Sequence, residues 1–78
     1  MSVTPNPVSN EATLIFPYAV FNPEISVLNT LGNEVLNVRL QGEYNYSKIN
    51  TSTLTNGIYF LKVIADGKIY QTKLVIIR

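Results

Sequence analysis

Two apolar stretches joined by Asp66-Gly67 constrain the fold of this chain more than any other feature of its sequence. β-Branched and aromatic residues are frequent from Ile58 to Ala65 and from Ile69 to Ile77, as they are in strands. The dipeptide between them suits the positive φ angles of a type I′ turn. The sequence therefore predicts an antiparallel hairpin. One face would carry Tyr59, Leu61, Val63 and Ala65 from the first strand and Tyr70, Leu74 and Ile76 from the second.

The rest of the chain also reads as short strands. They are predicted over Ala12 to Phe16, Glu24 to Asn29, Glu34 to Leu40 and Tyr44 to Ile49. In the third of these, apolar and polar residues alternate with the period of two that is typical of a half-buried strand. Long stretches with the period of a helix are missing.

Turn-forming residues separate the predicted strands. Pro17 and Asn22-Pro23 are expected breaks, because proline is rarely found inside a central strand. Leu31-Gly32-Asn33 is the expected turn of a first hairpin. Six or seven strands at this spacing predict an all-β fold, a small antiparallel immunoglobulin-like β-sandwich of about seven strands. We expect residues 1–78 to form a single domain, in which residues 1–9 are an extended linker segment.

The composition argues against an enzyme. The 78 residues include no Cys, His or Trp, so a disulfide, a Cys/His metal site, a thiol nucleophile and a histidine base are all excluded. The carboxylates fall singly at segment edges and turns, where they are expected to be solvated. These are Glu11, Glu24, Glu34, Glu43 and Asp66. A non-catalytic domain without a cofactor is predicted.

The distribution of charge and hydropathy bears on partners and location. Six basic residues face five acidic ones, scattered along the chain, so no basic patch is available to bind nucleic acid. No apolar run approaches the roughly 18 residues needed to span a bilayer. The first residues lack the features of a signal peptide. The chain is thus expected to be either cytoplasmic or a module of a longer, exported protein.

The tyrosines fall into two groups with different expected roles. Tyr18, Tyr44 and Tyr46 are expected to be exposed and form the only plausible set for stacking on sugars, which would suit a fibronectin-like or carbohydrate-binding module of a surface enzyme or adhesin. Tyr59 follows the tight turn Asn56-Gly57, where its hydroxyl can bond back to the upstream backbone as in the tyrosine corner of immunoglobulin-like sandwiches.

The order of the motifs is more specific than any one of them. Pro5-Asn6-Pro7-Val8 is followed by Ile25 to Leu36, by Ile49 to Leu54, by Gly57-Ile58-Tyr59, by Val63 and Gly67, and by Lys73-Leu74-Val75. Over Pro5 to Arg78, this series resembles the C-terminal sorting domain of the type IX secretion system, in its type A form.

This resemblance implies a secretion signal that directs an upstream cargo domain of the same chain through the outer-membrane translocon. A cell-surface sortase would then process or anchor the cargo. The protein would be exported, pass through the periplasm, and finish at the cell surface or be secreted. The resemblance implies that recognition involves Pro5, Asn6, Pro7, Gly32, Gly57, Tyr59, Gly67, Lys73 and the closing strand.

The closing strand supports an inference of its own. Val75 and Ile77 share a face with Lys73, opposite Leu74 and Ile76, so the strand is apolar on both faces. Such a strand is a good candidate for sheet-edge recognition by the translocon. Alternatively, Val75 and Ile77 only close the sandwich or mediate self-association. A monomer is expected by default, and the last strand leaves a dimer open.

Overall fold

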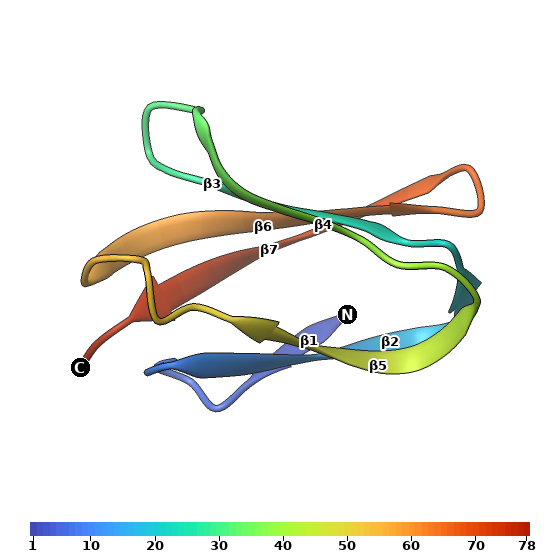
Figure 1. The fold of residues 1–78 in the computed structure, drawn as a ribbon, viewed down its shortest axis with the longest axis horizontal. Coiled ribbons are helices and arrows are strands. Elements are labelled where there is room, and N and C mark those ends of the chain that lie inside the picture. The colour runs from blue at the N-terminus through green and yellow to red at the C-terminus, as the bar shows by residue number, and fades with distance from the viewer.

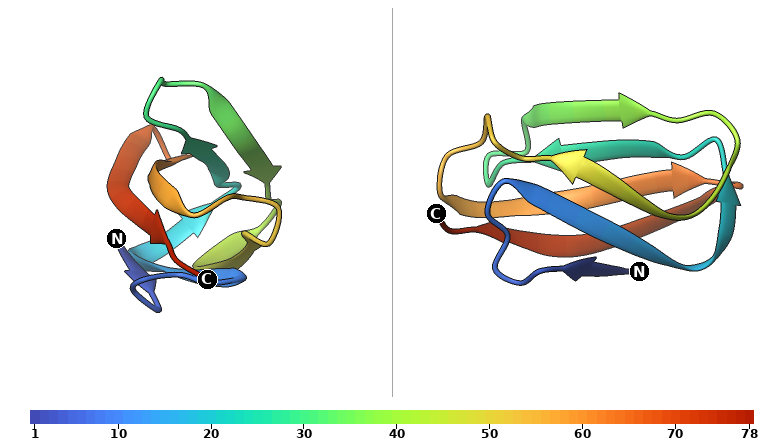
Figure 2. Two further views of the ribbon diagram at one scale, coloured as in Figure 1. Left: turned by 90° about the vertical axis from the view of Figure 1, so that its left-hand side faces the viewer. Right: turned by 60° about the horizontal axis from the view of Figure 1, so that its bottom comes forward.

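The computed structural model describes residues 1–78 as seven β-strands in two antiparallel sheets (Figure 1). The strands are β1 (Ser2–Thr4), β2 (Glu11–Phe21), β3 (Glu24–Leu28), β4 (Glu34–Arg39), β5 (Glu43–Asn50), β6 (Gly57–Ala65) and β7 (Lys68–Ile76). One sheet has the order β1-β2-β5 and the other β4-β3-β6-β7. The two sheets face each other as the layers of a sandwich (Figure 2), and the predicted all-β fold is confirmed.

The β6–β7 hairpin follows the prediction from the sequence. Gly57–Ala65 pairs without a register shift against Lys68–Ile76. The turn residues Asp66 and Gly67 have φ angles of 54° and 72°, as a type I′ turn requires. This turn matches the right-handed twist of the strands that it joins.

The first hairpin is also confirmed, with strands slightly shorter than predicted. Between β3 and β4, the Asn29 side-chain oxygen accepts hydrogen bonds from the backbone N–H groups of Leu31 and Asn33, each at 3.0 Å. The Gly32 N–H donates to the Asn29 carbonyl at 3.0 Å, and Gly32 has a φ of 86°. The asparagine side chain therefore holds a turn that glycine completes.

The predicted break at Pro17 is wrong. β2 continues through it to Phe21, and Pro17 is exposed. The pairing of β2 with β5 shifts register between Ile15 and Val20. A proline is tolerated at such an irregularity because the ladder does not require its missing N–H there.

The core lies between the two sheets and contains fifteen buried apolar residues. The predicted inward face of β6 is confirmed, since Tyr59, Leu61, Val63 and Ala65 are all buried. On β7, Leu74 and Ile76 are buried and Tyr70 packs half-buried against them. Every buried side-chain nitrogen or oxygen has a hydrogen-bond partner.

Residues 1–9 contact the sandwich in two places. β1 pairs with β2, with Ser2 opposite Ile15, and Val8 forms an isolated parallel bridge with Ile76. Between these contacts the chain turns at Pro5–Pro7, where the Thr4–Pro5 and Asn6–Pro7 peptide bonds are cis. No helix is long and apolar enough to cross a membrane.

Candidate recognition site

The end of β7 is covered by the N-terminal segment. The Val8 N–H donates to the Val75 carbonyl at 2.8 Å, and the Ile77 N–H donates to the Val8 carbonyl at 2.9 Å. The Val8 side chain is 1% exposed. β7 is an edge strand, as the order of the sheet shows. Its last residues, however, have a backbone partner inside the domain.

Several of the predicted site residues meet beside this contact. Pro5, Asn6, Lys73 and Val75 contribute to the lining of a cavity of about 230 Å³ next to β1 and β7. Lys73 and Ile77 are exposed, and Val75 is half-buried. The exposed Pro7 directly precedes Val8. The structure therefore brings the proline turn together with the closing strand, although the two are far apart in the sequence.

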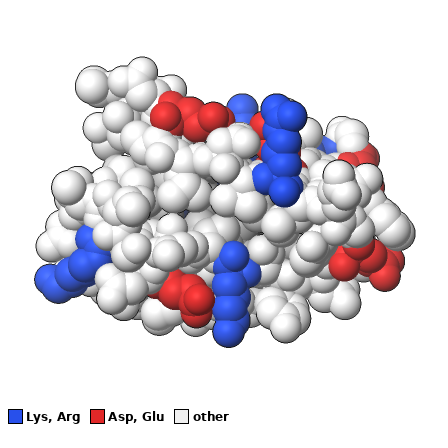
Figure 3. All heavy atoms as spheres, in the orientation of Figure 1, with Lys and Arg blue, Asp and Glu red and all other residues white.

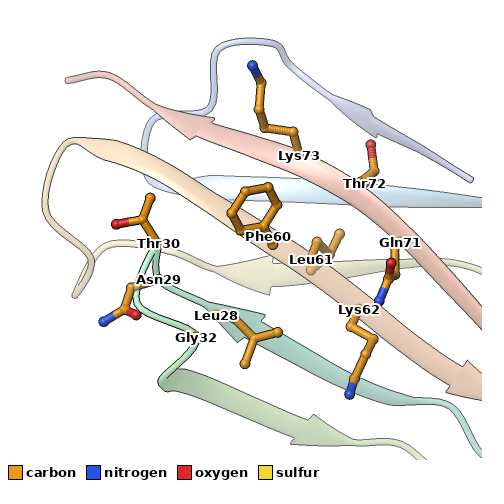
Figure 4. Close-up of a pocket in the computed structure, with 10 residues that line it drawn as sticks. All are labelled: Leu28, Asn29, Thr30, Gly32, Phe60, Leu61, Lys62, Gln71, Thr72 and Lys73. Atoms are coloured by element: carbon orange, nitrogen blue, oxygen red, sulfur yellow. The ribbon is translucent and has the colours of Figure 1, made fainter.

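Gly32, in the β3–β4 turn, lines a second depression that also includes Lys73. It lies in the lining of a groove of about 450 Å³ that includes Phe60 and Lys73. Figure 4 shows Phe60 between the turn residue Thr30 and the β7 residue Lys73. Phe60 is on β6, which lies between β3 of the first hairpin and the edge strand β7.

The predicted tyrosine corner is confirmed. The Tyr59 hydroxyl donates to the Thr55 carbonyl at 2.8 Å and lies 3.1 Å from the Thr55 hydroxyl. Gly57 stands opposite Ile76 in the β6–β7 pairing, so this corner adjoins the end of the closing strand. Gly67 is the exception among the predicted residues. It occupies the β6–β7 turn at the opposite end of the molecule from the C-terminus (Figure 1).

Arg78 is a structurally important residue that the sequence reasoning missed. Its guanidinium donates to the carbonyl oxygens of Thr51 and Leu54 and, through Nε, to the Asn10 side chain at 2.9 Å. Its backbone N–H donates to the Asn56 side chain at 3.1 Å. The last residue is thus bound to the β5–β6 loop and to the segment before β2. Its being a terminal basic residue was the only signal in the sequence.

Charged side chains are dispersed on the face that Figure 3 shows, with basic and acidic groups interspersed among uncharged atoms. The Glu24 carboxylate accepts a hydrogen bond from the Asn37 side-chain nitrogen at 3.0 Å and lies 3.4 Å from the Arg39 Nε. The Asn37 hydrogen bond, and next the Arg39 charge, lower the pKa of Glu24. This group of residues connects β3 to β4.

The three tyrosines that were expected to be exposed are not all exposed. Tyr18 and Tyr46 are 71% and 59% exposed, but Tyr44 is half-buried and packs against the core. The expectation for Tyr44 is therefore wrong, because its strand turns that side chain toward the sandwich. The Lys68 ammonium lies 5.9 Å from the centre of the Tyr18 ring, within the range of a cation–π contact.

Comparison with known families identifies the family of the chain. Residues 2–77 match the family model of the secretion system C-terminal sorting domain. The chain belongs to this family. A search of curated proteins found no match to the chain. The sorting domain is a non-catalytic secretion signal of cargo proteins of the type IX system. It implies an exported protein, secreted or at the cell surface, that interacts with the secretion machinery. The predicted sorting-domain family, without its type A form, and the predicted function as a secretion signal are confirmed.

Proposed function

We propose that this sorting domain is of type A and is read as a folded unit by the outer-membrane translocon. The cargo would be the upstream domain of the same chain. After passage from the periplasm, a surface sortase would remove the domain by cutting upstream of it and would anchor or release the cargo.

The observation that supports recognition of the folded domain is the contact between its two terminal segments. Val8 is bonded to Val75 and Ile77, and the cavity next to it has Pro5, Asn6 and Lys73 in its lining. A partner that contacts this corner touches residues from both ends of the chain at once. These residues are adjacent only after folding, so a linear peptide from either end would not reproduce the surface. We therefore propose Pro5, Asn6, Pro7, Lys73, Val75 and Ile77 as its recognition residues, with Gly32, Gly57 and Tyr59 supporting them, and Gly67 shaping the hairpin.

The test is surface delivery of an exported reporter fused to residues 1–78 in a bacterium that has a type IX system. We expect Lys73→Glu to reduce delivery several-fold, because it reverses a charge on the proposed surface. Lys48→Glu is the matched control, since Lys48 is also exposed but lies on the other sheet. Equal delivery by the wild type and by Lys73→Glu would contradict the proposed surface.

Deleting Lys73–Arg78 is a poor substitute for this experiment. The deletion also removes Leu74 and Ile76, which are 1% and 0% exposed in the core. Loss of delivery would then follow from unfolding, whatever the translocon contacts. A substitution at an exposed side chain avoids this ambiguity.

A further inference from the structure

The first part of β7 has free backbone hydrogen-bonding groups. Ala65 and Lys68 face each other across the two-residue turn, so Lys68 and every second residue after it bond to β6. The intervening residues Ile69, Gln71 and Lys73 direct their N–H and C=O groups away from β6. Val75 and Ile77 have the same parity, and it is their backbone groups that bond to Val8. The edge is therefore filled at residues 75–77 and has no such backbone partner from Ile69 to Lys73, although Ser2 and Val3 of β1 share the lining of a cavity with Lys73.

Apart from Lys68 and Lys73, this open edge lacks the usual protection against strand pairing. Proteins protect edge strands with short length, proline, bulges or charges. β7 has nine residues without proline, pairs with β6 without a register shift, and exposes 63% of Ile69.

The other edges differ from this one. β1 has only three residues. On β4, the edge residues Asn37 and Arg39 are engaged with Glu24. β5 carries charges of both signs, and its Lys48 lies 4.0 Å from Glu11.

Two lysines without an ion pair lie on the outer face beside the open edge. Lys73 is on β7, and Lys62 is opposite Gln71 in the β6–β7 pairing. Neither has a carboxylate within 4.0 Å, since the ion pairs of the domain are Arg39–Glu24 and Lys48–Glu11. Lys68 pairs with the buried Ala65 and so lies on the inner face, with its ammonium 5.9 Å from the centre of the Tyr18 ring. A complementary partner would be acidic on the outer face of the sheet.

The cavity near the same edge indicates what the inward side chains of a partner would meet. About 230 Å³ of space adjoins β7, and Val3, Val8 and Leu74 are part of its lining. A strand added beside β7 would direct alternate side chains inward and outward. Apolar inward side chains would extend over this cavity, and acidic outward side chains would lie near the lysines.

We propose that Ile69–Lys73 binds an extended acidic segment of a partner protein as an additional β-strand. The bound segment would alternate acidic and apolar residues. This proposal rests on the proposed function and deepens it, because it names the chemistry of the element of the secretion machinery that reads the domain. The Pro5–Pro7 turn and Val8 limit the bound strand at one end, so about five of its residues would pair.

The experiment titrates the ¹⁵N-labelled domain with a synthetic peptide of alternating Glu and Val, seven residues long and blocked at both ends. We expect amide shifts concentrated at Ile69, Gln71 and Lys73. A peptide with Lys in place of Glu is the charge control and should cause no shifts there. Equal binding of the two peptides, or shifts elsewhere only, would overturn the proposal.

Two variants separate backbone pairing from charge. Gln71→Pro removes an N–H that points away from β6, whereas Gln71→Ala keeps it. We expect the first to abolish binding and the second to retain it, with amide dispersion confirming that each is folded. Lys73→Glu leaves the backbone unchanged and should weaken binding by about tenfold through charge reversal. Undiminished binding by folded Gln71→Pro, or by Lys73→Glu if Gln71→Pro does not fold, would overturn the proposal.

Two further outcomes distinguish this proposal from self-association and from recognition without strand addition. Shifts at Ile69–Lys73 that grow with protein concentration alone, and that the acidic peptide does not alter, would assign the edge to a second copy of the domain. In the secretion assay, folded Gln71→Pro with full delivery would overturn strand addition as the mode of recognition but leave the sorting function intact. Loss of delivery by Gln71→Pro, with delivery retained by Gln71→Ala, is the result that we expect.

Discussion

At the scale of single residues, Tyr59 joins a buried ring to a backbone hydrogen bond. Its side chain is 7% exposed, and its hydroxyl donates to Thr55. We expect Tyr59→Phe to lower the free energy of unfolding by about 1 kcal/mol, since the ring still packs while one hydrogen bond is lost. Urea denaturation measures the change. Tyr46→Phe is the control, because Tyr46 is 59% exposed, and it should be nearly neutral. Equal effects of the two substitutions would contradict this role of the hydroxyl.

Glu24 provides a prediction about pH. Its folded-state pKa is lowered, first by the Asn37 hydrogen bond and then by Arg39. Its contribution to stability is therefore complete above the ordinary glutamate pKa and is lost as the pH falls through the lowered folded-state value. We expect Asn37→Ala and Arg39→Ala each to raise the pKa of Glu24, as measured by carboxyl NMR titration, because each removes a group that favours the charged carboxylate. Lys48→Ala, on the other sheet, should leave it unchanged. An unchanged pKa in Asn37→Ala would contradict the assignment of that hydrogen bond as the main cause.

Residue roles could be predicted from the sequence where they depend on adjacent residues. The turn at Asp66-Gly67 and the corner at Tyr59 are local, and both were predicted correctly. The Arg78 contacts were not predictable, because the three acceptor residues of its guanidinium come from segments that only the folded chain brings together. Tyr44 was misjudged for a similar reason, since its burial depends on packing of the sheets.

At the scale of elements, alternation and turn chemistry predicted most strands within a residue or two. β2 was the main failure, because a bulge accommodates Pro17 and only the pairing with β5 reveals it. The closing strand was correctly read as apolar on both faces. Its free and covered parts could not be separated from the sequence, because Val8 lies 68 positions away from Ile76.

The attachment of the last strand to the β5–β6 loop depends on Arg78. We expect Arg78→Ala to lower the free energy of unfolding by about 1–2 kcal/mol, since several hydrogen bonds from a charged donor are lost at a solvent-accessible site. Arg78→Lys should recover less than half, because an ammonium lacks the planar fork that reaches separate acceptors.

Urea denaturation and amide exchange at Thr51–Asn56 measure this effect. Arg39→Ala is the matched control, and it should cost less than Arg78→Ala because its ion pair is largely exposed. Full recovery by Arg78→Lys would show that charge alone, and not the geometry of the guanidinium, stabilises the end of the chain.

At the scale of the whole molecule, the sequence predicted two layers of strands and two hairpins, but not which other strands pair. β2 pairs with β5 and β3 with β6, and the loops between them carry no signal for these choices. The choice follows from burying every apolar face at once, which is a property of the complete chain. The same property makes the fold depend on its last residues.

We therefore expect residues 1–73 alone to be unfolded. Leu74 and Ile76 are almost completely buried, and burial of two such side chains contributes about 3–6 kcal/mol. A core of this size, without a disulfide or metal, supplies only about 3–5 kcal/mol of net stability. This loss is as large as the net stability of the domain. Circular dichroism and amide dispersion should therefore show a disordered chain. Adding a synthetic peptide of residues 74–78 in excess should restore little structure, because the peptide would have to pay its association entropy without the hairpin turn. A folded 1–73 fragment would contradict this dependence. If the prediction holds, only a chain that includes the end of β7 presents the contact of Val8 with Val75 and Ile77.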